Sequence, residues 1–361
     1  MSEPVADITI AVHSATRPIA RAVSSILDHT QTDVRVNVVA HNIDPEVIRA
    51  NLGVYADDPR VRLLEFTDGI PSPAGPMNHG LDSSTGQFVG LLGSDDEFAP
   101  GAIDSWVRVL REWNADVVLA KIRLATGLVD PYPPVRWSAR SRLLDPVKDR
   151  LSYRSAPLGL VRNERFGGLR LTEGLPSGED LAYSLTLWFT ADRIVYDLDG
   201  PAYVIHPDAT DRVTYAPRPI DQDFAFLDAI AALPWFSSAA PRIRIAVTAK
   251  LIRIHLFDAI AARTLTQSGL ESNRGDLVEL IGRFEQMAPG VTRLLSRADR
   301  NVIDLIHRPD PSADQIQDAV GARHNYLAFS TLFPRELRFS LHRQAPFRTL
   351  FAGYRIQRES K

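Results

Sequence analysis

One stretch of the chain decides the fold, and it reads Gly86-Gln87-Phe88-Val89-Gly90-Leu91-Leu92-Gly93-Ser94-Asp95-Asp96-Glu97. The apolar run at residues 88–92 predicts a buried strand. Three carboxylates follow it directly, and burying such a cluster is costly unless a positive group meets it. A divalent cation would do so, because Mg²⁺ and Mn²⁺ prefer carboxylate and phosphate oxygens. The alternative is an acidic loop that caps a helix beginning at Pro100.

Strands and helices alternate around this stretch. We expect strands at residues 7–13, 34–40, 61–66, 88–92 and 117–122. A first helix is expected to run to about Leu27, with Pro18 in its first turn. Further helices are expected after an Asp44 N-cap, at 76–84 and at 100–113. This alternation predicts an α/β fold with a mainly parallel sheet covered on both faces. Open sheets of this kind bind ligands at the carboxyl ends of their strands.

The second half of the chain changes character. Residues 125–156 are irregular. A helix is expected from Gly178 to about Thr190, and two short strands are expected near 193–198 and 201–206. Helical periodicity follows at 221–233, 241–265, 275–287 and 299–307. We therefore predict two domains, an α/β domain over 1–217 and an α-helical domain over 218–361. The second would shape an acceptor site, join subunits of a homo-oligomer or contact a membrane surface.

Composition narrows the function classes. Of 361 residues, 45% are hydrophobic and 24% charged, which is typical of a soluble globular protein. The net charge of −3 provides no basic field for nucleic acid. The absence of cysteine excludes disulfides, thiolate metal sites and a cysteine nucleophile. Since the sequence has no signal pattern and no apolar run of roughly 20 residues, we expect a cytoplasmic protein.

The acidic stretch resembles the motif region of family 2 glycosyltransferases with the GT-A (Rossmann-like) fold. The upstream run Gly75-Pro76-Met77-Asn78-His79-Gly80-Leu81 is similar to a helix of that family, with Met77 in place of the usual arginine. The resemblance spans about residues 7–206. It implies that Asp95 ligates the metal that bridges the donor's diphosphate. Gly93 stands where the family has the first Asp of an Asp-x-Asp motif, and Asp96 could compensate.

A second acidic pair lies in Ser177-Gly178-Glu179-Asp180. One interpretation is a capping box, with Ser177 capping a helix and Asp180 returning to its backbone N–H. The other is catalytic, because an attacking acceptor hydroxyl must lose its proton to a general base. The family carries a Glu-Asp pair at this distance from the acidic turn. The resemblance therefore implies Asp180 as the base and Glu179 as its support or as an acceptor-orienting group.

Further ligands are expected near the strand ends. His13 and His41 end the first two strands, and Asp68 follows the third. The family's second strand usually ends in Asp-Asp, so uridine diphosphate is not assumed here. The donor-binding set that we predict comprises His13, Ser14, Arg17, His41, Asp68, Asn78, Ser94, Asp95 and Arg212. The predicted ligands for Mn²⁺ or Mg²⁺ are Asp95, Asp96 and His206.

Two other regions leave alternatives open. Tyr132, Arg136 and Trp137 could stack on an acceptor sugar or simply pack. Residues 335–361 hold seven Lys/Arg against two Glu, interleaved with aromatic and leucine residues. That tail could lie on an anionic membrane at the inner face. We favour the alternative, in which it packs on the core with its arginines outward.

The predicted reaction moves a sugar from a nucleotide-diphosphate donor to a hydroxyl of a saccharide or bacterial cell-surface glycopolymer, with the inversion that the resemblance implies. Two alternatives stay open. A sugar nucleotidyltransferase would release pyrophosphate, although no glycine-rich basic loop follows the first strand. A non-catalytic scaffold with the same fold would account for Gly93 and for the Ala40-His41 strand end.

Overall fold

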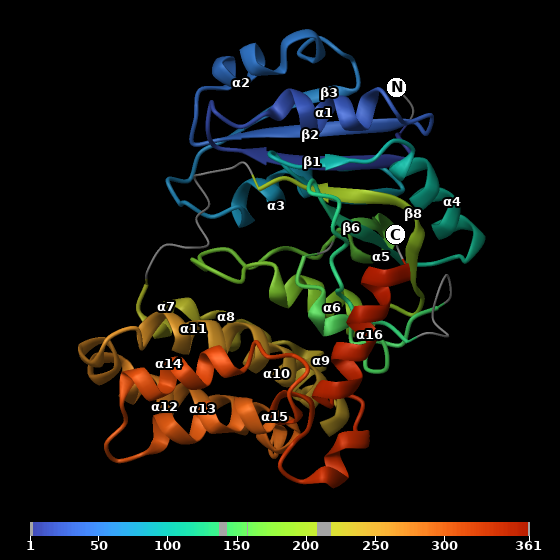
Figure 1. Ribbon diagram of the computed structural model, residues 1–361. Coiled ribbons are helices and arrows are strands. Elements are labelled where there is room, and N and C mark those ends of the chain that lie inside the picture. Colours follow the sequence, from blue (N-terminus) through green and yellow to red (C-terminus); the bar gives the residue numbers. More distant parts are fainter. Residues whose placement is uncertain (1–2, 137–142, 157, 208–217, 360–361) are drawn as a thin grey trace.

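The computed structural model describes residues 3–136, 143–156, 158–207 and 218–359. A layered α/β region forms one half of the molecule and a group of helices the other (Figure 1). Within the described residues, no helix has the length and apolar character needed to span a membrane.

The eight-stranded sheet has the order β3-β2-β1-β4-β7-β6-β8-β5. Its first four strands run parallel: β3 (Val61–Phe66), β2 (Val34–His41), β1 (Ala6–Val12) and β4 (Phe88–Gly93). The short β7 (Gly159–Arg162) pairs antiparallel with β4 and with β6 (Val117–Leu124). β8 (Ile194–Ile205) is parallel to β6, and the two-residue β5 (Glu97–Phe98) is antiparallel at the edge. The predicted mainly parallel sheet is confirmed.

This topology places the strand ends that matter on one edge. The two antiparallel pairings of β7 cancel, so β6 and β8 run in the same direction as β4. The carboxyl ends of β1, β2, β3, β4 and β8 therefore share an edge. Every polar residue expected to bind donor or metal after a strand lies on that edge.

Helices cover both faces of the sheet, and alternate side chains of one strand show how. Phe88 and Leu92 of β4 pack in a core with α1 (Ile19–Leu27) and α4 (Ala102–Glu112). Val89 and Leu91 face the opposite core, with α3 (Ala74–Asp82), α6 (Leu181–Thr190) and Ile356 of the last helix. α2 (Pro45–Leu52) follows β2 and adds Ile48 and Leu52 to the first core.

The structure confirms one predicted helix cap and differs from the prediction at Pro18 and at the last long strand. Asp44 is the N-cap of α2, and its carboxylate accepts a 2.9 Å hydrogen bond from the Glu46 N–H, as expected. Pro18 was placed wrongly, because it precedes α1 as N-cap instead of lying in the first turn. The two short strands near 193–206 are one strand, β8. Its pairing with β6 jumps from Asp197 to Ala202, and the skipped residues account for the apparent break.

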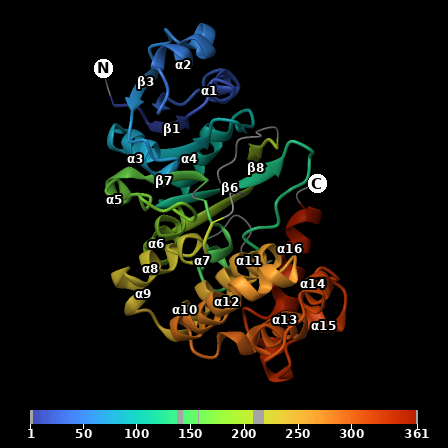
Figure 2. The ribbon, with the colours of Figure 1, turned by 90° about the vertical axis from the view of Figure 1, so that its left-hand side faces the viewer.

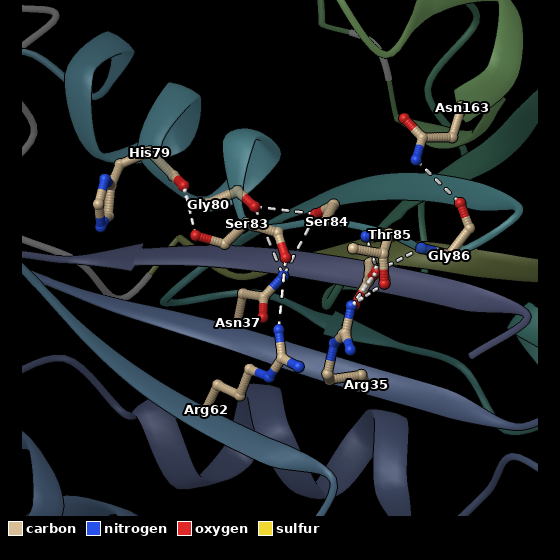
Figure 3. Close-up of polar contacts among 11 residues, drawn as sticks. Arg35, Asn37, Arg62, His79, Gly80, Ser83, Ser84, Thr85, Gly86 and Asn163 are labelled. Atoms are coloured by element: carbon tan, nitrogen blue, oxygen red, sulfur yellow. Dashed lines mark hydrogen bonds and ion pairs between the residues drawn. The ribbon is translucent and has the colours of Figure 1, made fainter. Parts of the chain in front are cut away.

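A polar brace anchors the opposite edge of the sheet (Figure 3). Asp7 of β1 is fully buried, and its two carboxylate oxygens bind the Arg35 guanidinium at 2.6 and 2.7 Å. The Thr85 and Gly86 N–H groups donate to the same carboxylate at 2.8 and 2.7 Å. Arg62 and Asn37 reach the neighbouring Ser83 and Ser84 from β3 and β2 (Figure 3). The brace fixes the chain where it enters β4, the strand that carries the acidic turn.

The helical region has its own core and includes a face of α6. The elements are α7 (Ile220–Asp223), α8 (Phe226–Ala231), α9 (Pro234–Ser237), α10 (Pro241–Leu251), the π-helical η5 (Ile252–Leu256), α11 (Phe257–Arg263), α12 (Gln267–Met287), η6 (Val291–Leu294), α13 (Arg297–His307), α14 (Ala313–Ala322), α15 (Phe329–Leu332), η7 (Leu337–Leu341) and α16 (Pro346–Glu359). Figure 2 shows α6 between the sheet and α8. Leu181, Ala182 and Leu185 pack in the helical core, whereas Leu187 and Trp188 pack against the sheet. α6 therefore joins the two regions.

Candidate active site

The acidic turn between β4 and β5 is tied to the last strand. The Tyr203 hydroxyl donates to Oδ2 of Asp96 at 2.7 Å and accepts from the Gly93 N–H at 2.9 Å. The backbone N–H of His206 donates to Oδ1 of Asp96 at 3.0 Å. Burial and the nearby Asp96 carboxylate raise the pKa of Tyr203 well above its usual value. Asp96 thus holds the turn against β8, in addition to the metal-binding role predicted from the sequence.

Gly93 is required by this arrangement. A Cβ at residue 93 would lie 2.8 Å from Oδ2 of Asp96 and 3.2 Å from Oδ1 of Asp95. The first distance is shorter than a van der Waals contact, and Tyr203 restrains the oxygen concerned. The space that an aspartate side chain would need at position 93 is therefore filled by the neighbouring carboxylate.

Asp95 faces two arginines of the segment that begins α1. The Arg17 guanidinium lies 2.9 Å from Oδ2 of Asp95, and both residues are buried. Arg21, in the first turn of α1, donates to the Asp95 backbone carbonyl. The predicted residues Arg17, Ser94 and Asp95 are therefore gathered at the carboxyl ends of β1 and β4, with Ser94 buried between the strand and Asp95.

His206 lies beside the same turn. Its Nε2 is 3.2 Å from Oε1 of Glu97, and its backbone binds Asp96. Among the described residues, no group of three or more histidine, aspartate or glutamate side chains is arranged to hold a metal ion. The chain thus offers the Asp95 carboxylate and the His206 imidazole near one turn, and not a closed protein cage.

A second polar group forms at the ends of β2 and β3. Nε2 of His41 lies 2.8 Å from Oδ1 of Asp68, and the Asn42 side-chain amide contacts both residues. Burial acts to raise the pKa of Asp68, but hydrogen bonds from His41, the Ile70 N–H and Asn42 outweigh it and lower that pKa. The structure therefore brings together His41 and Asp68, which the sequence placed after different strands.

The remaining predicted donor residues differ in their surroundings. His13 is exposed just after β1, and the Ser14 hydroxyl contacts Oγ1 of Thr16 at 2.8 Å. Asn78 on α3 is buried and binds inside the protein, donating to the Leu171 carbonyl at 3.0 Å and accepting from the Leu171 N–H at 2.9 Å. This exchange fastens the segment before Asp180 to α3. Arg212 lies outside the described residues.

Asp180 lies half-buried at the N-terminus of α6. The helix begins at Leu181, and Asp180 is the N-cap residue but makes no capping hydrogen bond through its side chain. The capping-box interpretation is therefore wrong. Surrounding protein and then the Glu179 carboxylate raise the pKa of Asp180 to about 7, although Lys250 acts in the opposite direction. Burial also raises the pKa of Glu179, against a lowering effect of Arg218.

The backbone before Asp180 depends on a glycine. Gly178 has φ +72°, in the left-handed region that glycine adopts without steric cost. A Cβ there would also lie 2.8 Å from the Phe226 ring of α8. The turn that presents Glu179 and Asp180 thus packs directly on the helical region.

The acceptor candidates in the irregular segment make contacts within the protein. Tyr132 stacks on Tyr153 with ring centroids 5.5 Å apart, and burial raises its pKa to about 12. Arg136 binds the buried Asp149 carboxylate at 2.7 and 2.8 Å. Trp137 lies outside the described residues. Packing therefore accounts for Tyr132 and Arg136.

Sequence reasoning missed three residues near these carboxylates: Arg21, Tyr203 and Lys250. Arg21 lies in the first turn of α1, four residues beyond Arg17, which precedes the helix. Tyr203 lies three residues before His206 in a strand already predicted. Lys250 lies 70 positions beyond Asp180 on α10, and no local pattern connects the two.

Comparison with known proteins identifies the segment that carries the acidic turn. The model of glycosyl transferase family 2 matches residues 7–163. The chain carries a family 2 glycosyltransferase domain. Chondroitin synthase of Pasteurella multocida is 27% identical over 128 residues, and chondroitin synthase of Escherichia coli is 29% identical over 128 residues. A Campylobacter jejuni GalNAc(5)-diNAcBac-PP-undecaprenol beta-1,3-glucosyltransferase is 27% identical over 99 residues.

Solved structures extend the likeness of fold beyond this domain. The structure of S. aureus TarS 1-349 in complex with UDP-GlcNAc has a TM-score of 0.71, at 16% identity, over 88% of this chain and 90% of that one. The GT-A fold and the helical C-terminal region are thereby confirmed. The matched segment covers only 13% of the Pasteurella synthase and 36% of this chain.

Proposed function

We propose that this protein is an inverting glycosyltransferase that moves a sugar from a nucleotide-diphosphate donor to a hydroxyl group of a glycopolymer. One observation carries the proposal. The segment that matches family 2 presents Asp95 at the carboxyl edge of the sheet. Beyond that segment lies a second carboxylate, Asp180, whose pKa is raised to about 7 and whose side chain caps no helix. A base poised near neutral pH suits the removal of an acceptor proton.

The donor would bind along the carboxyl edge of β1, β2 and β4. Arg17 beside Asp95 offers a planar guanidinium that can grip diphosphate oxygens in pairs. The His41 and Asp68 pair lies where a nucleotide base or ribose would be read. Because the similar TarS structures hold UDP-GlcNAc or UDP, a uridine nucleotide is the first donor to test. Asn78, which fastens the 171–173 segment, would act by positioning.

A divalent cation fits this site in one particular way. Mg²⁺ is commonly held by one or two protein ligands together with substrate phosphate oxygens and water. Asp95 and His206 provide a carboxylate and an imidazole of that kind near the acidic turn. A bound cation would neutralise charge that develops on the departing diphosphate. Asp96, held by Tyr203 and His206, would keep this turn in place.

Asp180 would do the proton chemistry. As the acceptor oxygen bonds to the anomeric carbon, the bond from that carbon to the diphosphate breaks and the hydroxyl proton passes to the Asp180 carboxylate. Attack from the face opposite the leaving group inverts the anomeric configuration. Glu179 precedes the base in the same turn, and we assign it the orientation of the acceptor.

The C-terminal tail exposes aromatic and basic side chains of the kind that bind a membrane surface. Ile356 of α16 is buried against the sheet side, as the packing alternative expects. Its neighbours Phe351 and Tyr354 are more than half exposed, and Leu341 is 81% exposed. Exposed Arg338, Arg343 and Arg358 accompany them. We propose that this aromatic and basic surface brings the protein to anionic lipid at the cytoplasmic face.

Thermal unfolding with candidate donors tests the donor site. A ligand that binds only the folded state raises Tm by mass action. Uridine diphosphate and UDP-sugars, each with and without Mn²⁺, are expected to raise Tm, and Asp95→Ala should remove the Mn²⁺-dependent part. Asp57→Ala, which changes a fully exposed carboxylate, is the matched control. No shift with any nucleotide would argue for the scaffold alternative. An equal Mn²⁺-dependent shift in Asp95→Ala would contradict the role of Asp95 as a metal ligand.

A further inference from the structure

Lys250 of α10 is a buried cation that the proposed chemistry does not yet use. Its side chain is only 2% exposed. An ammonium taken out of water is costly unless the charge is compensated. A methionine would fill the same space without that cost, so packing alone does not explain a charged residue at this position.

Two neutral groups hold the ammonium in place. Nζ of Lys250 donates to Oγ of Ser155 at 2.8 Å and lies 3.0 Å from Nε2 of His255. Burial, followed by the charge of Lys250, lowers the pKa of His255 well below its usual value. His255 is therefore neutral, and its Nε2 accepts from the ammonium.

The backbone that makes this contact is unusual. Lys250 and His255 are five residues apart, and His255 lies in the π-helical turn η5. In a regular α-helix, neighbours on one face are three or four residues apart. The wider turn brings an i, i+5 pair onto one face, and π turns of this kind are frequent at functional sites.

A short chain of contacts connects this lysine to the turn that carries Asp180. The Ser184 hydroxyl donates to the Ser155 carbonyl, and the Ser184 N–H donates to the Asp180 carbonyl at 2.9 Å. Phe226 packs against both ends, since its ring lies 5.2 Å from the His255 ring and contacts the Gly178 position. The helical region and the base-bearing turn therefore share one rigid scaffold.

We propose that Lys250 is a positioning residue that keeps Asp180 ionised, so that the helical region completes the general base of the α/β domain. The inference rests on the proposed function, in which Asp180 accepts the acceptor proton. The charged groups that act on this site are Glu179 and Lys250 on Asp180, and Arg218 on Glu179. His255, being neutral, transmits no charge.

The opposing effects of these groups on the pKa of Asp180 explain why a cation is needed near it. Burial and the Glu179 carboxylate both raise the pKa of Asp180, and Lys250 opposes them. Burial lowers the pKa of Lys250 to about 8, while Asp180 acts to raise it. Each charge therefore favours the ionised form of the other. Without the lysine, Asp180 would be protonated, and unable to act as a base, over a larger part of the neutral range.

The pH dependence of kcat/KM tests this inference, because its acidic limb reports the base of the free enzyme. Lys250→Met should move that limb to higher pH by about one unit. Transfer at about pH 6.5 would then fall roughly tenfold, and activity would recover in alkaline buffer. Thr248→Val, a buried change of similar size on the same helix, should leave the limb in place.

The outcomes separate this inference from the proposed function. An unmoved limb in Lys250→Met, with wild-type transfer intact, overturns the role of Lys250 and leaves Asp180 as the base. Absence of transfer by the wild type refutes the proposed function itself. If Lys250→Met does not fold, Ser155→Ala releases the ammonium from its anchor and should shift the limb in the same direction by a smaller amount. An unchanged limb in that variant also overturns the inference.

Discussion

The Tyr203 hydroxyl donates a 2.7 Å hydrogen bond to the Asp96 carboxylate, joining the last long strand of the sheet to its acidic turn. The same oxygen accepts from the Gly93 N–H, so one phenol fixes both ends of the turn. Asp95 lies between these fixed points. The position of the proposed metal ligand is thus set by its neighbours on both sides.

Tyr203→Phe removes this link and keeps the ring. The partly buried Asp96 oxygen and the Gly93 N–H each lose a partner, which should lower the free energy of unfolding by about 1–3 kcal/mol. Urea denaturation measures the change, with the exposed Tyr326→Phe as control. Equal stability of the two variants would show that the turn does not depend on this hydroxyl.

Gly93→Asp restores the carboxylate that the family motif has at this position, yet it should lower activity. The new side chain would meet the Asp96 carboxylate, and a fourth negative charge would join a crowded turn. We expect lower Tm and slower transfer. Gly168→Asp is a suitable control because the space at that position is open. Faster transfer by Gly93→Asp would mean that the turn has room for a second metal-binding carboxylate.

Asp180→Asn should alter stability in a pH-dependent manner. The folded-state pKa of Asp180 is about 7, above its ordinary value of 3.8. Ionisation of this group therefore destabilises the fold as pH rises between these two values. The amide variant does not ionise. It should match the wild type near pH 4 and exceed its free energy of unfolding by about 1–3 kcal/mol near pH 8. A constant difference at all pH values would contradict the raised pKa.

Much of the fold could be predicted from local patterns. Apolar runs such as residues 88–92 and the Asp44 cap specify their own elements, because strand burial and capping depend on near neighbours. The position of β7 could not be predicted in this way. Its four residues pair antiparallel between β4 and β6, and that insertion depends on contacts far apart in sequence.

Some residues of the site could likewise be predicted from local sequence, and others could not. Asp95 and Asp180 have local signatures, a strand followed by carboxylates and an acidic pair before a helix. Lys250 has none, since its position on α10 predicts only a core-facing helix residue. Its contact with Ser155 depends on how the helical region packs on α6. The same packing explains Gly178, whose missing side chain makes room for Phe226.

The tail surface predicts salt-sensitive binding to anionic lipid. Cosedimentation with vesicles of phosphatidylglycerol should exceed that with phosphatidylcholine vesicles and fall as salt rises, because screening weakens the basic side chains. Replacing exposed Arg343 and Arg358 by Gln should reduce binding, whereas the same change at exposed Arg242 and Arg308 should not. Equal binding by both double variants would leave the tail without a membrane role.

The central claim, that Asp180 is the base of a sugar-transfer reaction, is tested most directly by analysing the products formed from UDP-sugars with a saccharide acceptor. The wild type should release uridine diphosphate and a lengthened acceptor. Asp180→Asn should still bind the donor while transferring about a hundredfold more slowly, or less. Turnover of Asp180→Asn at the wild-type rate, or release of pyrophosphate by the wild type, would contradict the claim.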